Sequence, residues 1–164
     1  MILIGLGGNL PSDAGPPATT IETALTQFRL YGIIVVARSS FYESEPVPRS
    51  DQPWFVNAVV RVETALGPDD LLARLHAIEH AFGRVRHERN EARTLDLDLL
   101  DYDGVIREDG GLILPHPRLH ERAFVLKPLS EVAPDWRHPV SERSAAELLA
   151  ELPEEARAAV QHLT

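Results

Sequence analysis

Apolar residues recur along the chain at two spacings, one typical of strands and one typical of helices. Residues 1–7 form an apolar run that ends in glycines, which predicts a buried strand. Residues 19–31 carry one apolar face at helical spacing, and Thr19 with Glu22 has the spacing of a capping box. Residues 33–42 are rich in β-branched side chains and predict a second strand.

The middle of the chain repeats this pattern after a break. Three prolines within residues 43–53 forbid regular strand pairing and predict a long loop. Residues 54–64 alternate with period two, as a third strand would. Pro68 and the two acidic residues after it begin a helix that we expect to end at Gly83. Residues 93–102 then predict a fourth strand.

The sequence patterns in the last third of the chain predict only short elements. Turn residues within 103–111 predict a small hairpin, residues 118–126 a short helix, and residues 144–152 and 154–163 two closing helices. The order of elements predicts an α+β fold with a ferredoxin-like βαββαβ antiparallel sheet and helices on one face, plus the hairpin and a C-terminal helical extension. We expect a single domain over residues 1–164, with the other sheet face open for a site.

Two acidic residues interrupt the apolar alternation of the predicted fourth strand. Successive side chains of a strand point to opposite faces, so Asp96 and Asp98 share one face and the leucines between and around them share the other. Two carboxylates on one strand face can hold Mg²⁺ together with water and substrate phosphates. An amphipathic strand with a solvated acidic face would show the same pattern, and the pair taken alone favours that simpler interpretation.

The predicted third strand has polar and aromatic residues on one face only. Phe55 and Asn57 lie on that face with Val59 and Arg61, whereas the opposite face is uniformly apolar and should pack under the helices. An aromatic ring beside an amide suits a planar heterocycle that makes hydrogen bonds. Taken singly, edge packing explains Phe55 and a turn or bulge contact explains Asn57.

Arginines crowd into the segment just before the acidic pair. Arg84, Arg86, Arg89 and Arg93 fall within ten residues of an otherwise acidic chain. Guanidinium groups bind phosphate oxygens bidentately and stabilise the charge of a transferring phosphoryl group. The chain has no glycine-rich P-loop, so this segment is a candidate phosphate-binding loop. The alternative is a solvated charged turn whose arginines pair with neighbouring glutamates.

A proline-containing segment around residue 116 supplies two more candidates. His116 and Arg122 could reach phosphate or ribose groups of a nucleotide. For a single histidine beside a proline turn, however, a structural hydrogen bond is the default interpretation. No other histidines have metal-ligand spacing that indicates a site.

Composition and charge narrow the classes of protein. The 164 residues carry a formal net charge of -9, which argues against a nucleic-acid partner. The absence of cysteine excludes disulfides and cysteine-based metal or nucleophile chemistry. No apolar run approaches the roughly 20 residues that span a bilayer, and the N-terminal segment lacks a basic leader. We therefore expect a cytoplasmic protein without a membrane partner.

Six segments, taken together and in order, resemble one enzyme family. They are GLGGNL at 5–10, SSFYESEPV at 39–47, QPWFVNAVVRVET at 52–64, GRVR at 83–86, RTLDLDLLDYDG at 93–104 and PHPRLHERAFVLKPLSEVAP at 115–134. Their order and spacing are similar to those of the 6-hydroxymethyl-7,8-dihydropterin pyrophosphokinases of folate biosynthesis. The resemblance extends from the first predicted strand to about Trp136.

The resemblance implies transfer of diphosphate from the co-substrate ATP to the hydroxymethyl oxygen of the pterin, with release of AMP. By position, Asp96 and Asp98 resemble the ligands of two Mg²⁺ ions that bridge the ATP phosphates. Arg84 and Arg93 resemble the catalytic loop arginines that stabilise the transfer. The residues that resemble the lining of the ATP site are Glu79, Arg84, Arg86, Arg93, Leu99, His116 and Arg122. Those that resemble the pterin site are Ser44, Val47, Phe55, Asn57 and Phe124, with the two phenylalanines on either side of the ring.

The chain departs from the family pattern at several positions. Gly8 stands where a serine is usual in the first motif, and the loop before Arg93 is one residue shorter. We expect these changes to alter affinity without removing the reaction.

Two other classes of function stay open on the residues alone. A metal-dependent glycosyltransferase also uses an Asp-x-Asp pair to bind a nucleotide diphosphate, although the chain is short for such an enzyme. A ferredoxin-like module could bind a nucleotide or RNA without catalysis, but RNA binding favours a basic surface. We expect a monomer whose partners are small-molecule substrates, ATP and the pterin.

Overall fold

The computed structural model describes residues 1–83 and 92–163, so the predicted loop arginines Arg84, Arg86 and Arg89 lie outside the described residues. Its main sheet has six antiparallel strands in the order β5-β1-β4-β3-β8, with β2 paired to a second stretch of β4. These strands are β1 (Ile2–Gly8), β2 (Ile33–Arg38), β3 (Tyr42–Ser44), β4 (Phe55–Thr64), β5 (Asp96–Tyr102) and β8 (Val160–His162). The predicted α+β class with an antiparallel sheet is confirmed.

The helices and a small hairpin complete the described part of the chain. The helices are α1 (Pro17–Gln27), α2 (Pro68–Ala81), α3 (Ala123–Val132), α4 (Ala145–Glu151) and α5 (Glu154–Ala158), with 3-10 turns at η1 (Phe28–Tyr31) and η2 (Leu119–Glu121). The predicted hairpin is formed by β6 (Arg107–Asp109) and β7 (Leu112–Leu114). Both α1 and α2 start with proline in their first turn, where its missing N–H costs no hydrogen bond.

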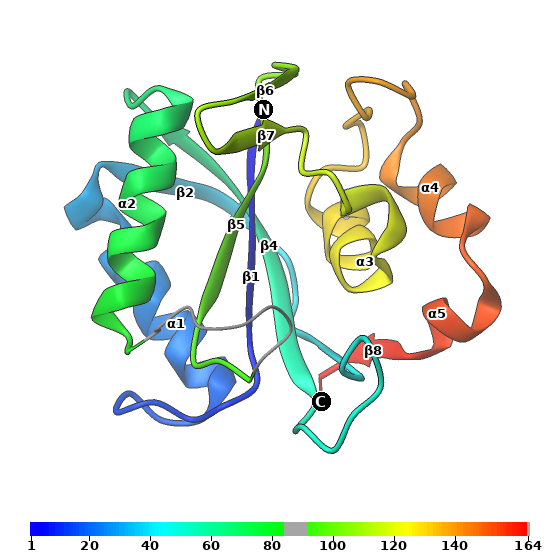
Figure 1. Ribbon diagram of the computed structural model, residues 1–164, viewed down its shortest axis with the longest axis horizontal. Helices are drawn as coiled ribbons and strands as arrows, with labels where there is room; N and C mark the ends of the chain where they lie inside the picture. The colour runs from blue at the N-terminus through cyan, green and yellow to red at the C-terminus, as the bar shows by residue number, and fades with distance from the viewer. Residues whose placement is uncertain (84–91, 164) are drawn as a thin grey trace.

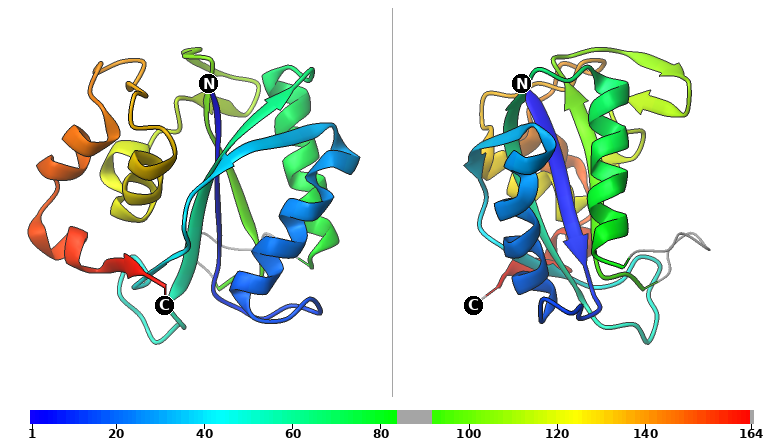
Figure 2. Two further views of the ribbon diagram at one scale, coloured as in Figure 1. Left: turned by 180° about the vertical axis from the view of Figure 1, so that it is seen from behind. Right: turned by 90° about the vertical axis from the view of Figure 1, so that its left-hand side faces the viewer.

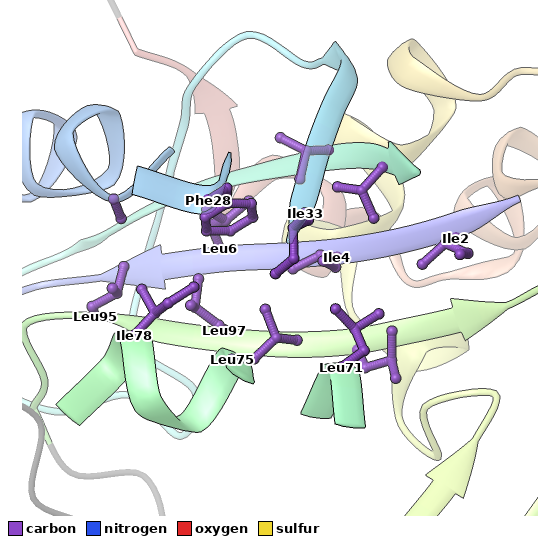
Figure 3. Packing of buried hydrophobic residues seen from close by; sticks show 14 of the residues in the cluster. Ile2, Ile4, Leu6, Phe28, Ile33, Leu71, Leu75, Ile78, Leu95 and Leu97 are labelled. Carbon is purple, nitrogen blue, oxygen red and sulfur yellow. The ribbon is translucent and has the colours of Figure 1, made fainter. Parts of the chain in front are cut away.

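One face of the sheet packs against α1 and α2, as predicted (Figure 1). Ile4 of β1, Leu97 of β5 and Leu75 of α2 are almost completely buried in this first core, and Figure 3 shows them interleaved between strand and helix. Burial of each such side chain contributes about 1.5–3 kcal/mol to stability. The leucine face of the fourth predicted strand is thus the core face, and Asp96 and Asp98 point away from it.

The expectation that helices cover only one face is wrong. A second core forms on the other face, where α3 packs across β4 and α4 packs beside α3 (Figures 1 and 2). Leu3, Val59 and Leu100 supply the sheet side of this core, and each is less than 2% exposed. Apolar side chains on both faces of a sheet require cover on both faces. The end of this face near Gly5 and Gly7 lines a cleft.

Two predicted boundaries near the N-terminus change in the structure. Helix α1 begins at Pro17, so the expected capping box at Thr19 does not form, and Glu22 instead pairs with Arg38 at 2.6 Å. The predicted strand over residues 33–42 divides into β2 and β3. The division falls at Ser39, whose hydroxyl accepts the N–H of Val59 at 3.0 Å in place of a backbone carbonyl.

The predicted last helix, residues 154–163, is also wrong in its second half. Helix α5 ends at Ala158, and the next residues form β8, which pairs with β3. The energy of joining a sheet edge outweighs the helical preference of this short polar stretch. Within the described ranges, none of the helices has the length and hydrophobicity needed to cross a membrane.

Candidate active site

Glycines form the floor of the open end of the sheet. In the sheet register, Gly7 of β1 lies between Asn57 of β4 and Asp96 of β5, and Gly5 lies beside Asp98. Directly paired residues point to the same face, so the acidic pair and Asn57 face one another across a strand that has no side chains there. A Cβ atom added at Gly7 would lie only 3.1 Å from Asn57 Oδ1. The glycines therefore create the space above the sheet.

A cleft lies above this floor, and most of the predicted site residues line it. The structure brings together residues from β3, the loop after it, β4, β5 and α3, although these segments are far apart in sequence. The predicted residues that line the cleft are Ser44, Val47, Phe55, Asn57, Arg93, Asp96, Asp98, Arg122 and Phe124. Sequence reasoning had not assigned two further lining residues, Arg118 and Glu121, although both lie in the same motif as His116 and Arg122.

One end of the cleft is acidic and is partly neutralised by arginine. Arg93 Nη1 donates to Asp96 Oδ2 at 3.0 Å, and both side chains are less than a fifth exposed. The central carbon of the Arg93 guanidinium lies 5.8 Å from the centre of the Phe55 ring. Arg93 thus lies between the acidic pair and the aromatic wall, where it can reach a charged group bound between them.

Asn9 holds Arg93 in this place, a role that the sequence did not suggest. Asn9 is buried, its Oδ1 accepts the N–H of Arg93 at 2.9 Å, and its own N–H donates to the Arg93 carbonyl at 2.9 Å. Its Nδ2 donates to Gln52 Oε1 and to the carbonyl of Pro53, both at 3.0 Å. The feature of the sequence that could have indicated this role is an asparagine directly after a strand that ends in two glycines.

The other end of the cleft combines aromatic rings with a fixed amide. Asn57 is buried, and its Nδ2 donates to Ser44 Oγ at 2.7 Å, which leaves Oδ1 on the side of the glycine floor. Phe55 and Phe124 line the cleft from the sheet and from α3. Arg122 lies over the Phe124 ring at 5.4 Å, as Arg93 lies over Phe55. Each of the two phenylalanine rings therefore has an arginine guanidinium over it.

His116 lies beside the cleft and is not among its lining residues. Its Nδ1 accepts the N–H of Arg118 at 3.2 Å, so in the neutral ring the proton is on Nε2. Burial and the charge of Arg122 lower the pKa of His116 to about 4, and the negative charge of Asp96 acts in the opposite direction. Burial also lowers the pKa of Arg122, opposed by Asp98. His116 is therefore a neutral hydrogen-bond donor at physiological pH.

Two predicted ATP-site residues are not in the cleft. Leu99 is buried in the first core, on the strand face opposite Asp98. Glu79 of α2 is also buried, and its carboxylate accepts the N–H of Leu97 at 2.7 Å. Neither side chain belongs to the lining of the open face. Arg84 and Arg86 cannot be compared, because they lie outside the described residues.

The acidic pair fits a divalent cation that is shared with a phosphate ligand. Asp96 and Asp98 are the two carboxylates that the sheet places together at the cleft. In residues 1–83 and 92–163 no group of three or more His, Cys, Asp or Glu side chains could hold a metal by itself. Mg²⁺ commonly binds through one or two carboxylates and completes its shell with water and substrate phosphates, which is the donor set available here.

The family model of the 7,8-dihydro-6-hydroxymethylpterin-pyrophosphokinases (HPPK) matches residues 3–134. The chain belongs to this family. The match contains the glycine floor, the acidic pair and both aromatic walls, and it ends just before Trp136. Five of the six motifs that carried the resemblance contribute residues to the cleft, and most of the sixth, GRVR at 83–86, lies outside the described residues.

Individual HPPK relatives agree with this assignment. The chain is 46% identical over 133 residues to the 2-amino-4-hydroxy-6-hydroxymethyldihydropteridine pyrophosphokinase of Methylorubrum extorquens, covering 80% of this chain and 82% of that protein. It is 44% identical over 153 residues to the enzyme of the same name from Pseudomonas aeruginosa, covering 93% and 91%.

Solved structures share the fold at low sequence identity. A crystal structure of Plasmodium falciparum HPPK-DHPS with pterin and p-hydroxybenzoate matches 98% of this chain with a TM-score of 0.74 and 15% identity. The chain spans only 46% of that longer protein. This similarity concerns the fold, whereas family membership rests on the sequence matches.

Proposed function

We propose that this protein transfers diphosphate from ATP to the hydroxymethyl oxygen of 6-hydroxymethyl-7,8-dihydropterin and releases AMP. The observation that carries the proposal is the HPPK match over residues 3–134, which includes segments 5–7, 44–59, 93–98 and 118–125 that contribute residues to one cleft. The strand order β5-β1-β4-β2, with α1 and α2 on one face, supports the ferredoxin-like arrangement predicted from the sequence. We also propose that residues 1–164 act as one monomeric, cytoplasmic pyrophosphokinase domain.

The pterin is proposed to bind at the aromatic end. Phe55 and Phe124 offer apolar ring faces from opposite walls, and Asn57 presents a carbonyl oxygen held in place by Ser44. A pterin is flat and carries hydrogen-bond donors on its edge, so aromatic stacking and one oriented amide can recognise it. Val47, which is largely exposed at the mouth of the cleft, would cover the outer edge.

The triphosphate is proposed to bind at the charged end. Arg93 and Arg122 line the cleft on the two sides of the acidic pair and can stabilise negative charge in the transition state. Asp96 and Asp98 would hold Mg²⁺, which when bound neutralises phosphate charge. His116 would donate a hydrogen bond from Nε2. Arg84 and Arg86, which lie outside the described residues, resemble further phosphate-binding residues of the family.

The geometry supports a transfer in which the protein mainly aligns and neutralises the reactants. The pterin hydroxyl oxygen forms a bond to the β-phosphorus, and the bond from that phosphorus to the α–β bridging oxygen breaks. The bridging oxygen leaves with AMP, and the proton of the pterin hydroxyl is released to solvent. Asn57 and the phenylalanines would hold the nucleophile, while the arginines would hold the transferred group, so that no covalent enzyme intermediate is needed.

Product analysis tests the proposal directly. The protein is incubated with ATP, Mg²⁺ and 6-hydroxymethyl-7,8-dihydropterin, and the nucleotides are separated by chromatography. We expect AMP and diphosphorylated pterin in equal amounts, and no AMP when the pterin or Mg²⁺ is omitted. Formation of ADP, or no pterin-dependent turnover by folded protein, would contradict the proposal. The family match does not favour the glycosyltransferase or RNA-binding alternatives.

A further inference from the structure

The pterin end of the cleft borders a short ribbon of two strands at the edge of the sheet. We define the β3–β8 ribbon as residues 41–45 together with residues 159–163. Its inner strand pairs with β4 in register, Ser44 opposite Phe55 and Tyr42 opposite Asn57. Ser44 also accepts the side-chain hydrogen bond of Asn57. The position of this inner strand therefore sets the orientation of the amide that faces the cleft.

The outer strand of the ribbon comes from the C-terminal end of the chain, beyond the HPPK match. It follows the inner strand along its whole length. At one end Leu163 N donates to the Phe41 carbonyl at 3.0 Å, and at the other end Glu45 N donates to the Ala159 carbonyl at 3.2 Å. Val160 pairs with Ser44 between them. Glu45 is the first of the residues 45–48 that form the outer wall of the cleft.

A single cation fixes the outer strand to α3. Lys127 is the only lysine of the chain, and its Nζ donates to the carbonyls of Arg157 at 2.7 Å and Val160 at 2.5 Å. The first carbonyl belongs to the last turn of α5 and the second to β8. Hydrogen bonds from an ammonium group are stronger than those between neutral groups. Loss of this donor would leave two half-buried carbonyls without it, which costs folding free energy.

The same helix fixes the inner strand and carries a wall of the pterin site. Glu131 accepts the N–H of Ser40 at 2.6 Å and the hydroxyl of Tyr42 at 2.9 Å. Phe124, Lys127 and Glu131 are spaced three and four residues apart, so they follow one side of α3. Helix α3 thus holds the outer strand through Lys127 and the inner strand through Glu131. The same helix places Phe124 in the lining of the cleft.

We propose that Lys127 is a positioning residue for the pterin. By holding β8 against β3, it fixes Ser44 and the wall at residues 45–48, and through Ser44 it fixes the Asn57 amide. Lys127 does not line the cleft, so it acts through these residues and not on the substrate. The inference rests on the proposed function, because it assigns a role at the pterin end and none at the phosphate end.

The test compares ligand affinities of full-length variants. We expect Lys127→Met to weaken binding of 6-hydroxymethylpterin about tenfold or more, as the loss of charge-assisted hydrogen bonds predicts. Affinity for a nonhydrolysable ATP analogue with Mg²⁺, and kcat at saturating pterin, should change less than about twofold. Lys127→Arg keeps the charge and should restore most of the affinity. Calorimetry gives both dissociation constants.

A matched control separates positioning from general weakening of the C-terminal segment. Arg143 pairs with Glu147 and Glu151 around α4, away from the ribbon. We expect Arg143→Gln to lower the melting temperature while leaving the pterin affinity unchanged. In a Ser44→Ala background, Lys127→Met should cost less pterin affinity than in the wild type, because its effect passes through Ser44.

Several outcomes would overturn the inference. Unchanged pterin affinity in folded Lys127→Met would do so, as would equal losses of pterin and ATP-analogue affinity. If Lys127→Met does not fold, Lys127→Gln replaces it, since it also removes the charge at this position, and an unchanged pterin affinity in that variant has the same meaning. A wild-type protein that binds no pterin would contradict the proposed function and this inference together, whereas the variant results affect the inference alone.

Discussion

Asp96 and Asp98 are neighbours on one strand face but differ in their surroundings. Asp96 accepts a hydrogen bond from Arg93, and Asp98 lies beside Gly5 on the floor. A bound phosphate–metal group would compete with Asp96 for the Arg93 guanidinium. The arginine stabilises the Asp96 carboxylate and is also in place to contact a phosphate bound in the cleft.

Removing either carboxylate should stop turnover without unfolding the protein. We expect Asp96→Ala and Asp98→Ala to lower kcat on the order of a thousandfold or more, because several kcal/mol of transition-state stabilisation is lost with the metal. Far-UV circular dichroism should be unchanged. Asp103→Ala is the control, since this exposed carboxylate near the N-terminus lies outside the cleft. Near-normal rates for both variants at saturating Mg²⁺ would contradict the metal assignment.

His116 should make stability depend on pH in the mildly acidic range. Burial and Arg122 hold its pKa at about 4, whereas in the unfolded chain it titrates near 6.5. Between these values the unfolded chain binds more protons, so stability is highest above about pH 6.5 and falls as the pH decreases toward 4. From pH 7 to pH 5 the loss from this residue should be about 2 kcal/mol.

Urea unfolding of the metal-free protein at the two pH values measures this effect. We expect His116→Gln to be less sensitive to pH than the wild type over the same interval. Equal pH dependence of the two proteins would show that other groups are responsible. The measurement concerns folding alone, so it does not depend on the activity of the protein.

Strand β1 lies close to the segment before β5 because residue 8 is a glycine and has no side chain. A Cβ atom at Gly8 would lie 2.6 Å from the backbone carbonyl oxygen of Thr94, closer than such atoms approach in real structures. Asn9 makes its hydrogen bonds to Arg93 directly next to this contact. A side chain at position 8 would therefore push the segment before β5 away from β1.

A serine at position 8 should destabilise this chain. We expect Gly8→Ser to lower the free energy of unfolding by about 1–3 kcal/mol, since the backbone must move to admit the side chain, and to lower turnover through Arg93. Gly5→Ala on the same strand is the stability control, because its Cβ would meet only the Leu100 side chain at an ordinary 3.5 Å. Equal unfolding midpoints for Gly8→Ser and the wild type would contradict this account.

A buried polar contact joins the end of β5 to the second core. Trp136 Nε1 donates to Asp101 Oδ2 at 2.6 Å, and Gly104 N donates to Asp101 Oδ1 at 2.9 Å. Both the indole and the carboxylate are 3% exposed. The contact links the sheet to the helices of the second face, so it matters for the whole molecule and not for the cleft.

Replacing this tryptophan should destabilise the protein while leaving its activity in place. We expect Trp136→Phe to cost about 1–3 kcal/mol in the free energy of unfolding, because a buried carboxylate loses a donor. Trp54→Phe is the control, since Trp54 is 43% exposed. Denaturation followed by circular dichroism compares the two variants. A loss for Trp136→Phe no larger than for Trp54→Phe would show that the contact contributes little.

Local patterns in the sequence were sufficient to predict much of the molecule. Period-two alternation separated Asp96 and Asp98 from the leucines of the same strand, and helical spacing predicted α1 and α2. These signals depend only on residues close together in the chain. The resemblance to HPPK, which depends on motifs in order, named nine of the residues that line the cleft.

Features that depend on distant contacts came only from the tertiary structure. Val160 joins β8 because the edge of β3 is available to it, and nothing in its own short segment specifies that partner. Helix α3 lies on the second face because the apolar side chains there need cover, and this places Lys127 on the β3–β8 ribbon. Leu99 and Glu79 are in the core because β5 packs on α2. Such pairings are decided by the burial of surfaces from separate parts of the chain, which local sequence cannot specify.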